Sequence, residues 1–262
     1  MRGGDDMNMS ARQDLVTKTP WLNAAGCLGF LPSADHWLWP EPQGAWITPP
    51  VSLARRTPAG NRCALPYPGG LLLHTGLANP GLNDVLRRCA ARWAQSGLPV
   101  WLHLLGDSAS DINRMVQAVE GQEGIQAIEL GVPPTASANE ARDMVSAAVG
   151  ELPLIVNVPL HRAHEGWLRQ LAGLGASALS LGAPRGMLPG PQGLISGRLY
   201  GPAIFPQALA ALRSVRRFNL PVIASGGIYE MQTAQTLLQA GAWAVQLDTV
   251  LWRGAPKLPT RS

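Results

Sequence analysis

Eight short apolar runs recur between residues 21 and 247, and longer amphipathic stretches separate most of them. The runs occupy residues 21–24, 45–48, 100–105, 127–130, 154–158, 178–181, 221–225 and 244–247. They are rich in Val, Ile, Leu and Ala, are bounded by Gly or Pro, and are continuously apolar rather than alternating. This pattern is typical of parallel strands that are covered on both faces. Eight such strands with helices between them predict a (β/α)8 barrel, also called a TIM barrel.

The stretches between the runs carry helix signals. Residues 79–97 place an apolar stripe at helical spacing, and Gly97 is expected at the C′ position just after the helix. The stripe consists of Leu82, Val85, Leu86, Cys89 and Trp93. Ser137 and Glu140 have the spacing of a capping box, which predicts that a helix begins there. The segments FPQALAALRSVRRFN and YEMQTAQTLLQAGA show the same amphipathic pattern.

A single domain is expected for the whole chain of 262 residues, because no linker-like segment divides it and single barrels often have this length. Residues 1–16 are mostly polar, and we expect them to form a flexible N-terminal segment. Residues 35–70 are rich in Pro, Trp and Gly, and we expect loop excursions over one end of the barrel. Function in such barrels resides at the C-terminal ends of the strands.

Composition and charge narrow the classes of partner. Charged residues make up 15% of the chain, below the typical ~25%, and there are nine Trp, which favours a homodimer or a partner subunit. The net charge of +4 comes from small separate groups of Arg, so we expect no nucleic-acid partner. The three Cys have no CxxC spacing and cannot all pair, which favours the cytoplasm. No window approaches ~18 uninterrupted apolar residues, so no membrane span is expected.

The motif SGGI at residues 225–228 stands between the last two apolar runs. Gly226 and Gly227 end a strand and open a helix, so their N–H groups could face a phosphate with no side chain in between. Thr249 comes one βα unit later, and these two loops are where (β/α)8 barrels frequently bind phosphate. A tight strand-to-helix turn that needs glycine for its geometry explains the same residues equally well.

Several motifs, in order, resemble those of the dihydroorotate dehydrogenase family. They include TPWLNAAGCLGF, GLLLHTGLANPGLNDVL, GRLYGPAIFPQALAAL and LPVIASGGIYEMQTAQTLLQAGAWAVQLDT, and the resemblance extends from about Thr17 to Trp252. Members of that family are FMN-dependent (β/α)8 barrels that oxidise a CH–CH bond, converting dihydroorotate to orotate. The resemblance implies substrate contacts at His74 and Asn79. It implies FMN contacts at Ala25, Gly26, Thr48, Asn157, Gly201, Ser225, Gly226, Gly227 and Thr249.

The chain departs from the family's pattern at positions that bind substrate or flavin. The replacements are Pro49 for Lys, His74 for Asn, Gly131 for Asn, Asn157 for Lys, Gly182 for Asn, and Asp248 for Gly. The loop VPPTASANEA contains no group equivalent to the family's catalytic Cys, and loss of a positioned base typically forfeits ~10²–10⁴-fold in rate. We therefore expect a substrate other than dihydroorotate. An ionised Asp248 about 4 Å from a phosphate would oppose its binding by roughly 1–4 kcal/mol.

Other residues are candidates for the missing chemistry. His74 is a candidate acid–base and substrate-binding group, and its alternative is a loop histidine that only packs. His103, within VWLHLLG, is a second candidate, and its alternative is a satisfied core histidine. Arg185, near the end of the sixth strand, could bind an anionic substrate or could lie on the surface. Glu129 is expected to be a buried structural acceptor.

Two functions therefore remain open. The first is a flavin-dependent oxidoreductase acting on another small molecule, and the intact glycine motifs favour it. The second is a non-catalytic barrel subunit or binding protein, a pseudoenzyme without flavin chemistry, and the Trp-rich, charge-poor composition favours it. No metal site is expected, because His161 and His164 lack a third ligand at suitable spacing. A yellow purified protein would support the first function.

Overall fold

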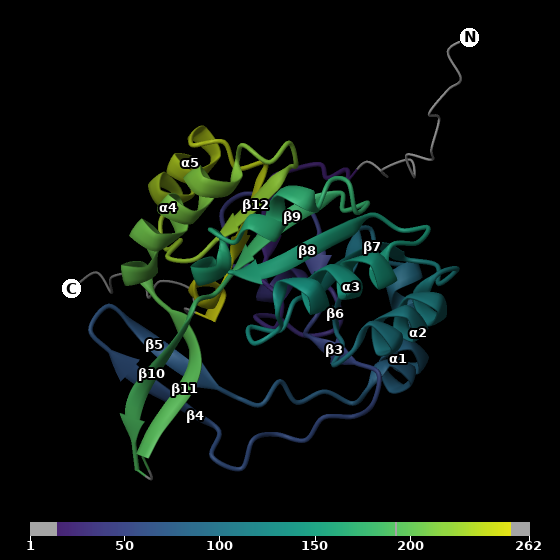
Figure 1. Cartoon of the computed structure of the whole chain (residues 1–262), viewed down its shortest axis with the longest axis horizontal. Helices are drawn as coiled ribbons and strands as arrows, with labels where there is room; N and C mark the ends of the chain where they lie inside the picture. Colours follow the sequence, from purple (N-terminus) through teal and green to yellow (C-terminus); the bar gives the residue numbers. More distant parts are fainter. Residues whose placement is uncertain (1–14, 192, 253–262) are drawn as a thin grey trace, which may run out of the picture.

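A parallel sheet closed into a barrel forms the centre of the molecule (Figure 1). The computed structural model describes residues 15–191 and 193–252, so most of the expected N-terminal segment, residues 1–14, lies outside the described residues. The strand order is β1-β13-β12-β9-β8-β7-β6-β2, and β3 pairs with β6 as well. The strands are β1 Trp21–Asn23, β2 Trp46–Ile47, β3 Val51–Ser52, β6 Val100–Leu105, β7 Ile125–Gly131, β8 Leu154–Pro159, β9 Ala178–Gly182, β12 Val222–Ser225 and β13 Ala244–Leu247.

Two short segments, β2 and β3, complete the barrel where the two ends of the sheet meet. A parallel bridge between Leu22 and Ala45 joins the β1 end of the sheet to the β2 end. β2 and β3 pair with successive parts of β6 and share one position in the barrel, because Pro49 and Pro50 interrupt the strand between them. The nine strands therefore occupy eight positions, and the predicted (β/α)8 barrel is confirmed.

The barrel interior has an apolar layer with a polar layer above it. Nine buried side chains fill the apolar layer: Leu22, Ala45, Ile47, Trp101, Ala127, Ile155, Ala178, Ile223 and Ala244. Two residues further along four of the strands stand His103, Glu129, Ser180 and Gln246, all buried. Because side chains alternate across a strand, these polar groups also point inward, while intervening residues such as Leu104 and Leu130 pack outward. Successive residues of these strands therefore face alternately into the barrel and towards the helices, although the sequence runs look almost uniformly apolar.

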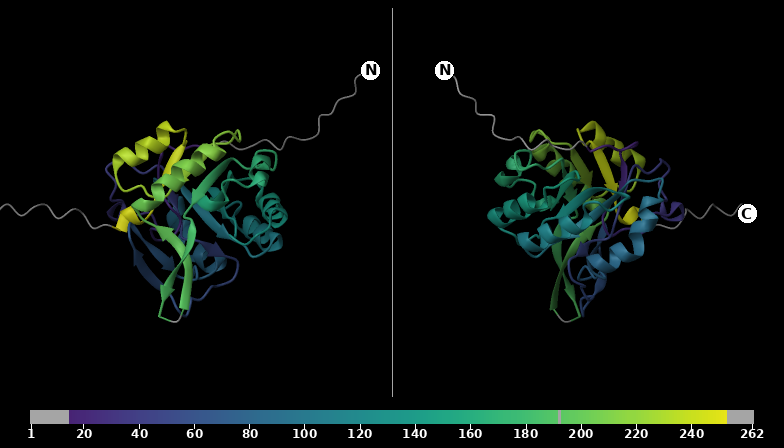
Figure 2. Two further views of the ribbon diagram at one scale, coloured as in Figure 1. Left: turned by 60° about the vertical axis from the view of Figure 1, so that its left-hand side comes forward. Right: turned by 90° about the vertical axis from the view of Figure 1, so that its right-hand side faces the viewer.

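Helices cover the outside of the barrel (Figures 1 and 2). They are α1 Leu82–Ala94, α2 Ala109–Val119, α3 Ala138–Ala148, α4 Phe205–Val215 and α5 Met231–Gln239. The predicted capping box of Ser137 and Glu140 is present at the start of α3. The expectation for Gly97 is wrong, because α1 ends at Ala94, its C-cap is Gln95, and Gly97 lacks a positive φ. Within the described residues, no helix is long and apolar enough to cross a membrane.

A second, antiparallel sheet of four strands extends from the barrel (Figures 1 and 2). Its order is β10-β11-β5-β4, with β4 at Cys63–Tyr67, β5 at Gly70–His74, β10 at Arg185–Gly190 and β11 at Gly193–Tyr200. The expectation of plain loop excursions for residues 35–70 is therefore wrong in its last part. β5 pairs with β11, more than a hundred residues later in the chain, and this partner was not visible in the local pattern.

Candidate functional site

A cavity of about 160 Å³, partly open to solvent, lies at the C-terminal ends of the barrel strands. Its lining includes residues that end or directly follow six strands: Ala24, Gly131, Pro159, Gly182, Ser225 and Asp248. Five of the predicted site residues line it: Ala25, His103, Asn157, Arg185 and Ser225. The position of the cavity is that of active sites in (β/α)8 barrels.

A buried histidine–carboxylate pair lies beneath the cavity. His103 Nδ1 is 2.6 Å from Glu129 Oε2, and Gln246 Nε2 donates to Glu129 Oε1 at 2.6 Å. Burial by itself would raise the pKa of Glu129, but the hydrogen bonds from His103 and Gln246 outweigh it and lower the pKa. The carboxylate is therefore ionised and accepts from both neighbours. Glu129, which the sequence predicts to be a buried structural acceptor, therefore also orients the ring of His103.

His103 presents its second ring nitrogen to the cavity lining. Nε2 is buried and has no hydrogen-bond partner among the described residues. A Cβ added to Gly131 would lie 2.6 Å from this nitrogen, so only glycine leaves room beside it. With Nδ1–H donated to Glu129, Nε2 carries a free lone pair. Thr48 supports the strand rather than the cavity, since its hydroxyl accepts the His103 backbone N–H at 3.1 Å.

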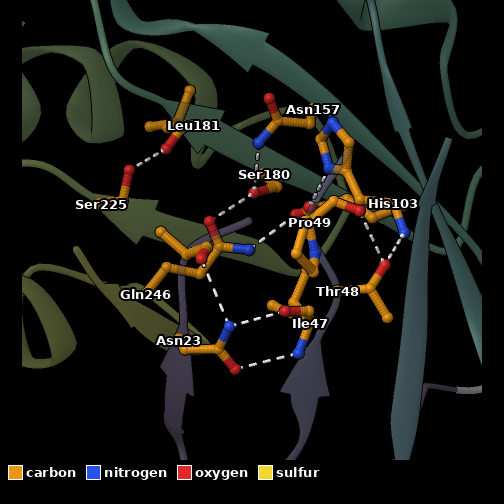
Figure 3. A network of polar contacts seen from close by, with 12 residues as sticks. Asn23, Ile47, Thr48, Pro49, His103, Asn157, Ser180, Leu181, Ser225 and Gln246 are labelled. Carbon is orange, nitrogen blue, oxygen red and sulfur yellow. Dashed lines mark hydrogen bonds and ion pairs between the residues drawn. The ribbon is translucent and has the colours of Figure 1, made fainter. Parts of the chain in front are cut away.

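Amide and hydroxyl side chains continue the polar layer across the barrel (Figure 3). Asn157 Nδ2 donates to Ser180 Oγ at 3.0 Å, and Ser180 Oγ donates to Gln246 Oε1 at 3.3 Å. Ser225 Oγ donates to the carbonyl oxygen of Leu181. These hydrogen bonds connect the four strands β8, β9, β12 and β13, so the side chains near the base of the cavity are held in fixed orientations.

Two arginines from the β10–β11 hairpin border the cavity. Arg185 and Arg198 are cross-strand partners, and both line it. Neither forms an ion pair with any described carboxylate; Arg185 has only a 3.5 Å contact with Ser196 Oγ. Burial, and then the charge of Arg198, lowers the pKa of Arg185. A third arginine of the lining, Arg56, is paired with Asp107 at 2.5 Å. Sequence reasoning missed Arg198 and Arg56.

Asp248 is buried, with 3% of its surface exposed, and it directly follows β13. Its carboxylate accepts from the Thr249 hydroxyl at 3.2 Å, and the neighbouring backbone N–H groups of Thr249 and Val250 act to lower its pKa. The Thr249 hydroxyl also contacts the hydroxyl of Tyr229. Burial raises the pKa of Asp248 to about 6 although these hydrogen bonds act to lower it. The Thr249 groups expected to bind phosphate are therefore engaged within the chain.

The predicted phosphate-binding glycines pack against protein atoms. Gly226 and Gly227 are buried, and they do not line the cavity. A Cβ on Gly227 would lie 2.3 Å from the backbone nitrogen of Phe205, and one on Gly226 would lie 3.0 Å from Ile204. Both have positive φ, 100° and 76°. The structure therefore supplies the alternative reason for these glycines, a close approach of the β12–α5 loop to the start of α4.

Two further glycines of the predicted flavin site are also outside the cavity lining. Gly201 has a φ of 131°, and a Cβ there would lie 2.3 Å from the carbonyl oxygen of Gly69 in the β4–β5 turn. Gly26 has a φ of 84° and packs beside Pro50. Their glycine identity is explained by turn geometry and close packing.

His74 and Asn79 do not line the cavity. His74, on β5, contacts the Ser196 carbonyl oxygen at 2.9 Å and Asn61 Oδ1 at 3.0 Å. Asn79 is buried, and its Oδ1 accepts the backbone N–H groups of Ser52 and Gly81. Its amide Nδ2 donates to the Leu77 carbonyl oxygen at 3.0 Å, so Asn79 holds its own loop together. Across residues 15–191 and 193–252 no cluster of side chains suits a metal ion.

Comparisons with known proteins agree with this fold. No family model matches the chain. A catalytic subunit of dihydroorotate dehydrogenase B (NAD(+)) from Desulforudis audaxviator is 28% identical, covering 90% of this chain and 83% of that protein. The subunit of the same name from Maridesulfovibrio salexigens is 26% identical over 90% of this chain and 84% of its own length. The resemblance to dihydroorotate dehydrogenases is therefore confirmed as a distant relationship along most of the chain.

A solved structure supports the fold independently. The M276A mutant of FabK from Thermotoga maritima superposes with a TM-score of 0.51 and 17% identity, covering 90% of this chain. The chain spans only 62% of that protein's length. This likeness concerns the fold alone.

Proposed function

We propose that the protein is a flavin-dependent oxidoreductase that acts on a small organic anion other than dihydroorotate. Its relatives are named as catalytic subunits of a dehydrogenase and align with about nine-tenths of the chain. The observation that carries the proposal is one cavity bordered by two guanidinium groups and an imidazole nitrogen; among residues 15–191 and 193–252, the guanidinium groups form no ion pair and the nitrogen has no hydrogen-bond partner. An organic acid would satisfy the guanidinium groups, and the imidazole could accept a proton from it.

We place the flat ring system of a flavin at the mouth of this cavity, because the chemistry of its lining favours it. Ala25, Gly131 and Gly182 add little bulk to its lining, and the Asn157 amide offers both donor and acceptor capacity to a polar ring edge. A bound flavin would supply a two-electron acceptor for oxidation of the substrate. FMN is the cofactor that the family resemblance implies, and it suits the cavity only in part.

The phosphate end of FMN does not suit the groups present. Asp248 takes the hydroxyl and N–H of Thr249, and the packing of Gly226 and Gly227 explains why these residues are glycine. We therefore assign no phosphate contact to Gly226, Gly227 or Thr249. The proposal concerns the flavin ring and leaves the phosphate to the next subsection.

The substrate class follows from Arg185 and Arg198. Planar guanidinium groups bind carboxylates in a bidentate way, and two of them side by side attract an anion strongly when no carboxylate of the protein neutralises them. The Lys and Asn groups that the family resemblance implies for dihydroorotate are Pro49, Gly131 and Gly182 here. A different organic acid, held from the hairpin side, is the substrate that this arrangement supports.

His103 is the group best placed to take a proton. Dehydrogenation of a substrate would transfer one hydrogen as hydride to the flavin and release the other as a proton, and His103, which lines the cavity, has a lone pair on Nε2 to accept it. Glu129 fixes the tautomer through Nδ1–H and stabilises the imidazolium that forms. Gly131 packs close beside Nε2, where a Cβ would lie only 2.6 Å from this nitrogen.

The first experiment asks whether the purified full chain binds a flavin. We expect quenching of flavin fluorescence on titration of the protein, and then bleaching of the bound flavin under anaerobic conditions by one member of a panel of organic acids. Absence of flavin binding would contradict the proposal. Changing both arginines, Arg185→Gln and Arg198→Gln, should raise the acid concentration for half-maximal bleaching at least tenfold, whereas Arg213→Gln on the exposed side of α4 should not.

The role of His103 has its own test. His103→Gln should slow flavin bleaching by about 10²–10³-fold, because the proton acceptor is removed, and should leave flavin affinity within about threefold. Stopped-flow absorbance measures the rate, and fluorescence titration measures the flavin affinity. An unchanged rate in a variant that still binds flavin would remove His103 from the reaction.

A non-catalytic binding protein is the second candidate. The engaged Thr249 groups and the loop after β7 without an equivalent of the family's Cys favour it. This candidate predicts that organic acids bind at Arg185 and Arg198 in a colourless protein. Thermal stabilisation by an acid with no quenching of flavin fluorescence would select it.

A further inference from the structure

We infer that the side-chain carboxylate of Asp248 occupies the phosphate-binding position at the end of the last barrel strand, so that the cavity selects a flavin lacking phosphate over FMN. The choice between the two flavins rests on the proposed function, whereas occupation of this position by Asp248 does not. Riboflavin is the ligand class that this selection favours.

The carboxylate accepts hydrogen bonds from groups of the kind that bind phosphate. It accepts from the hydroxyl of Thr249 at 3.2 Å, and the two successive backbone N–H groups of Thr249 and Val250 act on the carboxylate to lower its pKa. Amides and hydroxyls at the ends of the seventh and eighth strands form the usual phosphate site of (β/α)8 barrels. Here a charged group of the chain itself accepts those hydrogen bonds, and a phosphate would have to displace it.

The residues around Asp248 offer a phosphate little free space and few further hydrogen-bond donors. Tyr229 contacts Thr249 from the start of α5, and Phe205 closes on Gly227 with no space for an added atom. Ile204 and Leu160 border Gly226 with apolar atoms. A charged phosphate beside these apolar groups would lose hydration without gaining donors.

The charges near Asp248 do not neutralise it within the described part of the chain. No ion pair of Asp248 is formed there. Besides burial, the charge of Asp248 raises the pKa values of three groups: Cys27 after β1, Tyr67 on β4 and Tyr200 on β11. The charge of Arg198 acts to lower the pKa values of Cys27 and Tyr200. A phosphate dianion placed here would meet an uncompensated carboxylate, while the uncharged ribityl end of riboflavin would not.

The experiment compares riboflavin and FMN on the full chain by fluorescence titration at pH 7.5. The wild-type chain should bind riboflavin at least tenfold more tightly than FMN. Asp248→Gly frees the amides and removes the charge, and should raise FMN affinity at least tenfold while riboflavin affinity changes less than threefold. Asp248→Asn keeps an acceptor for the amides without charge and should give a smaller gain for FMN. Asp84→Asn, on the solvent side of α1, is the control for net charge and should leave the ratio unchanged.

Three outcomes are decisive. Wild-type FMN affinity equal to or above riboflavin affinity would overturn the inference, and so would an Asp248→Gly variant, folded by circular dichroism, with no gain for FMN. A wild-type chain that binds neither flavin would refute the proposed function. In that case a gain of FMN binding by Asp248→Gly would still support the inference, and no gain would overturn it.

Discussion

Asp248 and Glu129 are two buried carboxylates in one barrel, and their surroundings shift their pKa values in opposite directions. Glu129 accepts from His103 and Gln246, and these hydrogen bonds lower its pKa against the effect of burial. Burial dominates at Asp248 and raises its pKa to about 6. A hydrogen-bonded carboxylate thus supports the imidazole, while a poorly compensated one stands at the phosphate position.

Stability should therefore depend on pH through Asp248. Its folded-state pKa of about 6 lies above its ordinary 3.8, so its contribution is full below the ordinary value and is lost as pH rises through 6. The loss corresponds to about 3 kcal/mol, from roughly two pKa units. Asp248→Asn should remove this loss and make the chain more stable than wild type at pH 7.5. Urea unfolding at pH 4.5 and 7.5 measures the difference; an unchanged pH dependence in the variant would contradict the assignment.

At the scale of elements, the β12–α5 loop and the start of α4 fit together through glycine. The approach of Gly227 to Phe205 leaves no room for a Cβ, and both glycines of the loop have positive φ. Loss of flavin binding on substitution of Gly226 would therefore report disturbed packing as well as a lost ligand contact. The Asp248 variants separate the two effects, because they leave this packing in place.

Gly227→Ala should destabilise the chain by about 2–4 kcal/mol, because the added Cβ meets backbone atoms and the backbone conformation disfavours it. Gly97→Ala is the matched control, since its Cβ would meet nothing within 4 Å and its φ is not positive. Thermal unfolding of the two variants provides the comparison. Equal unfolding temperatures would show that the loop can move away from α4 at little cost.

At the scale of the whole molecule, the β10–β11 hairpin extends from the barrel (Figure 2). It exposes two large apolar side chains. Met187 is 64% exposed and Leu194 is 71% exposed. The homodimer or partner subunit expected from the charge-poor composition stays a prediction, and this hairpin is the surface we propose for it. Light scattering of the full chain should give the mass of a dimer, and Met187→Ser with Leu194→Ser should shift it towards the monomer. A monomeric wild-type chain would contradict self-association.

The sequence by itself determined the barrel, the order of its eight strands and the start of α3. Runs bounded by Gly or Pro and the Ser137–Glu140 spacing are local signals, and burial on both faces of a parallel strand is visible in one run at a time. The departures at Pro49, Gly131 and Asp248 could also be recognised without coordinates, so the expectation of another substrate needed no structure.

Only the tertiary structure decided which side chains meet. The pairing of β5 with β11 brings distant segments into one sheet, and strand register places Arg198 opposite Arg185 beside the cavity. His74 and Asn79 are bound by neighbours that the local pattern does not reveal, so they are absent from the cavity lining. The engagement of Thr249 by Asp248 depends on a side-chain rotamer and burial. Residue spacing encodes local periodicity, whereas contacts between elements depend on long-range packing.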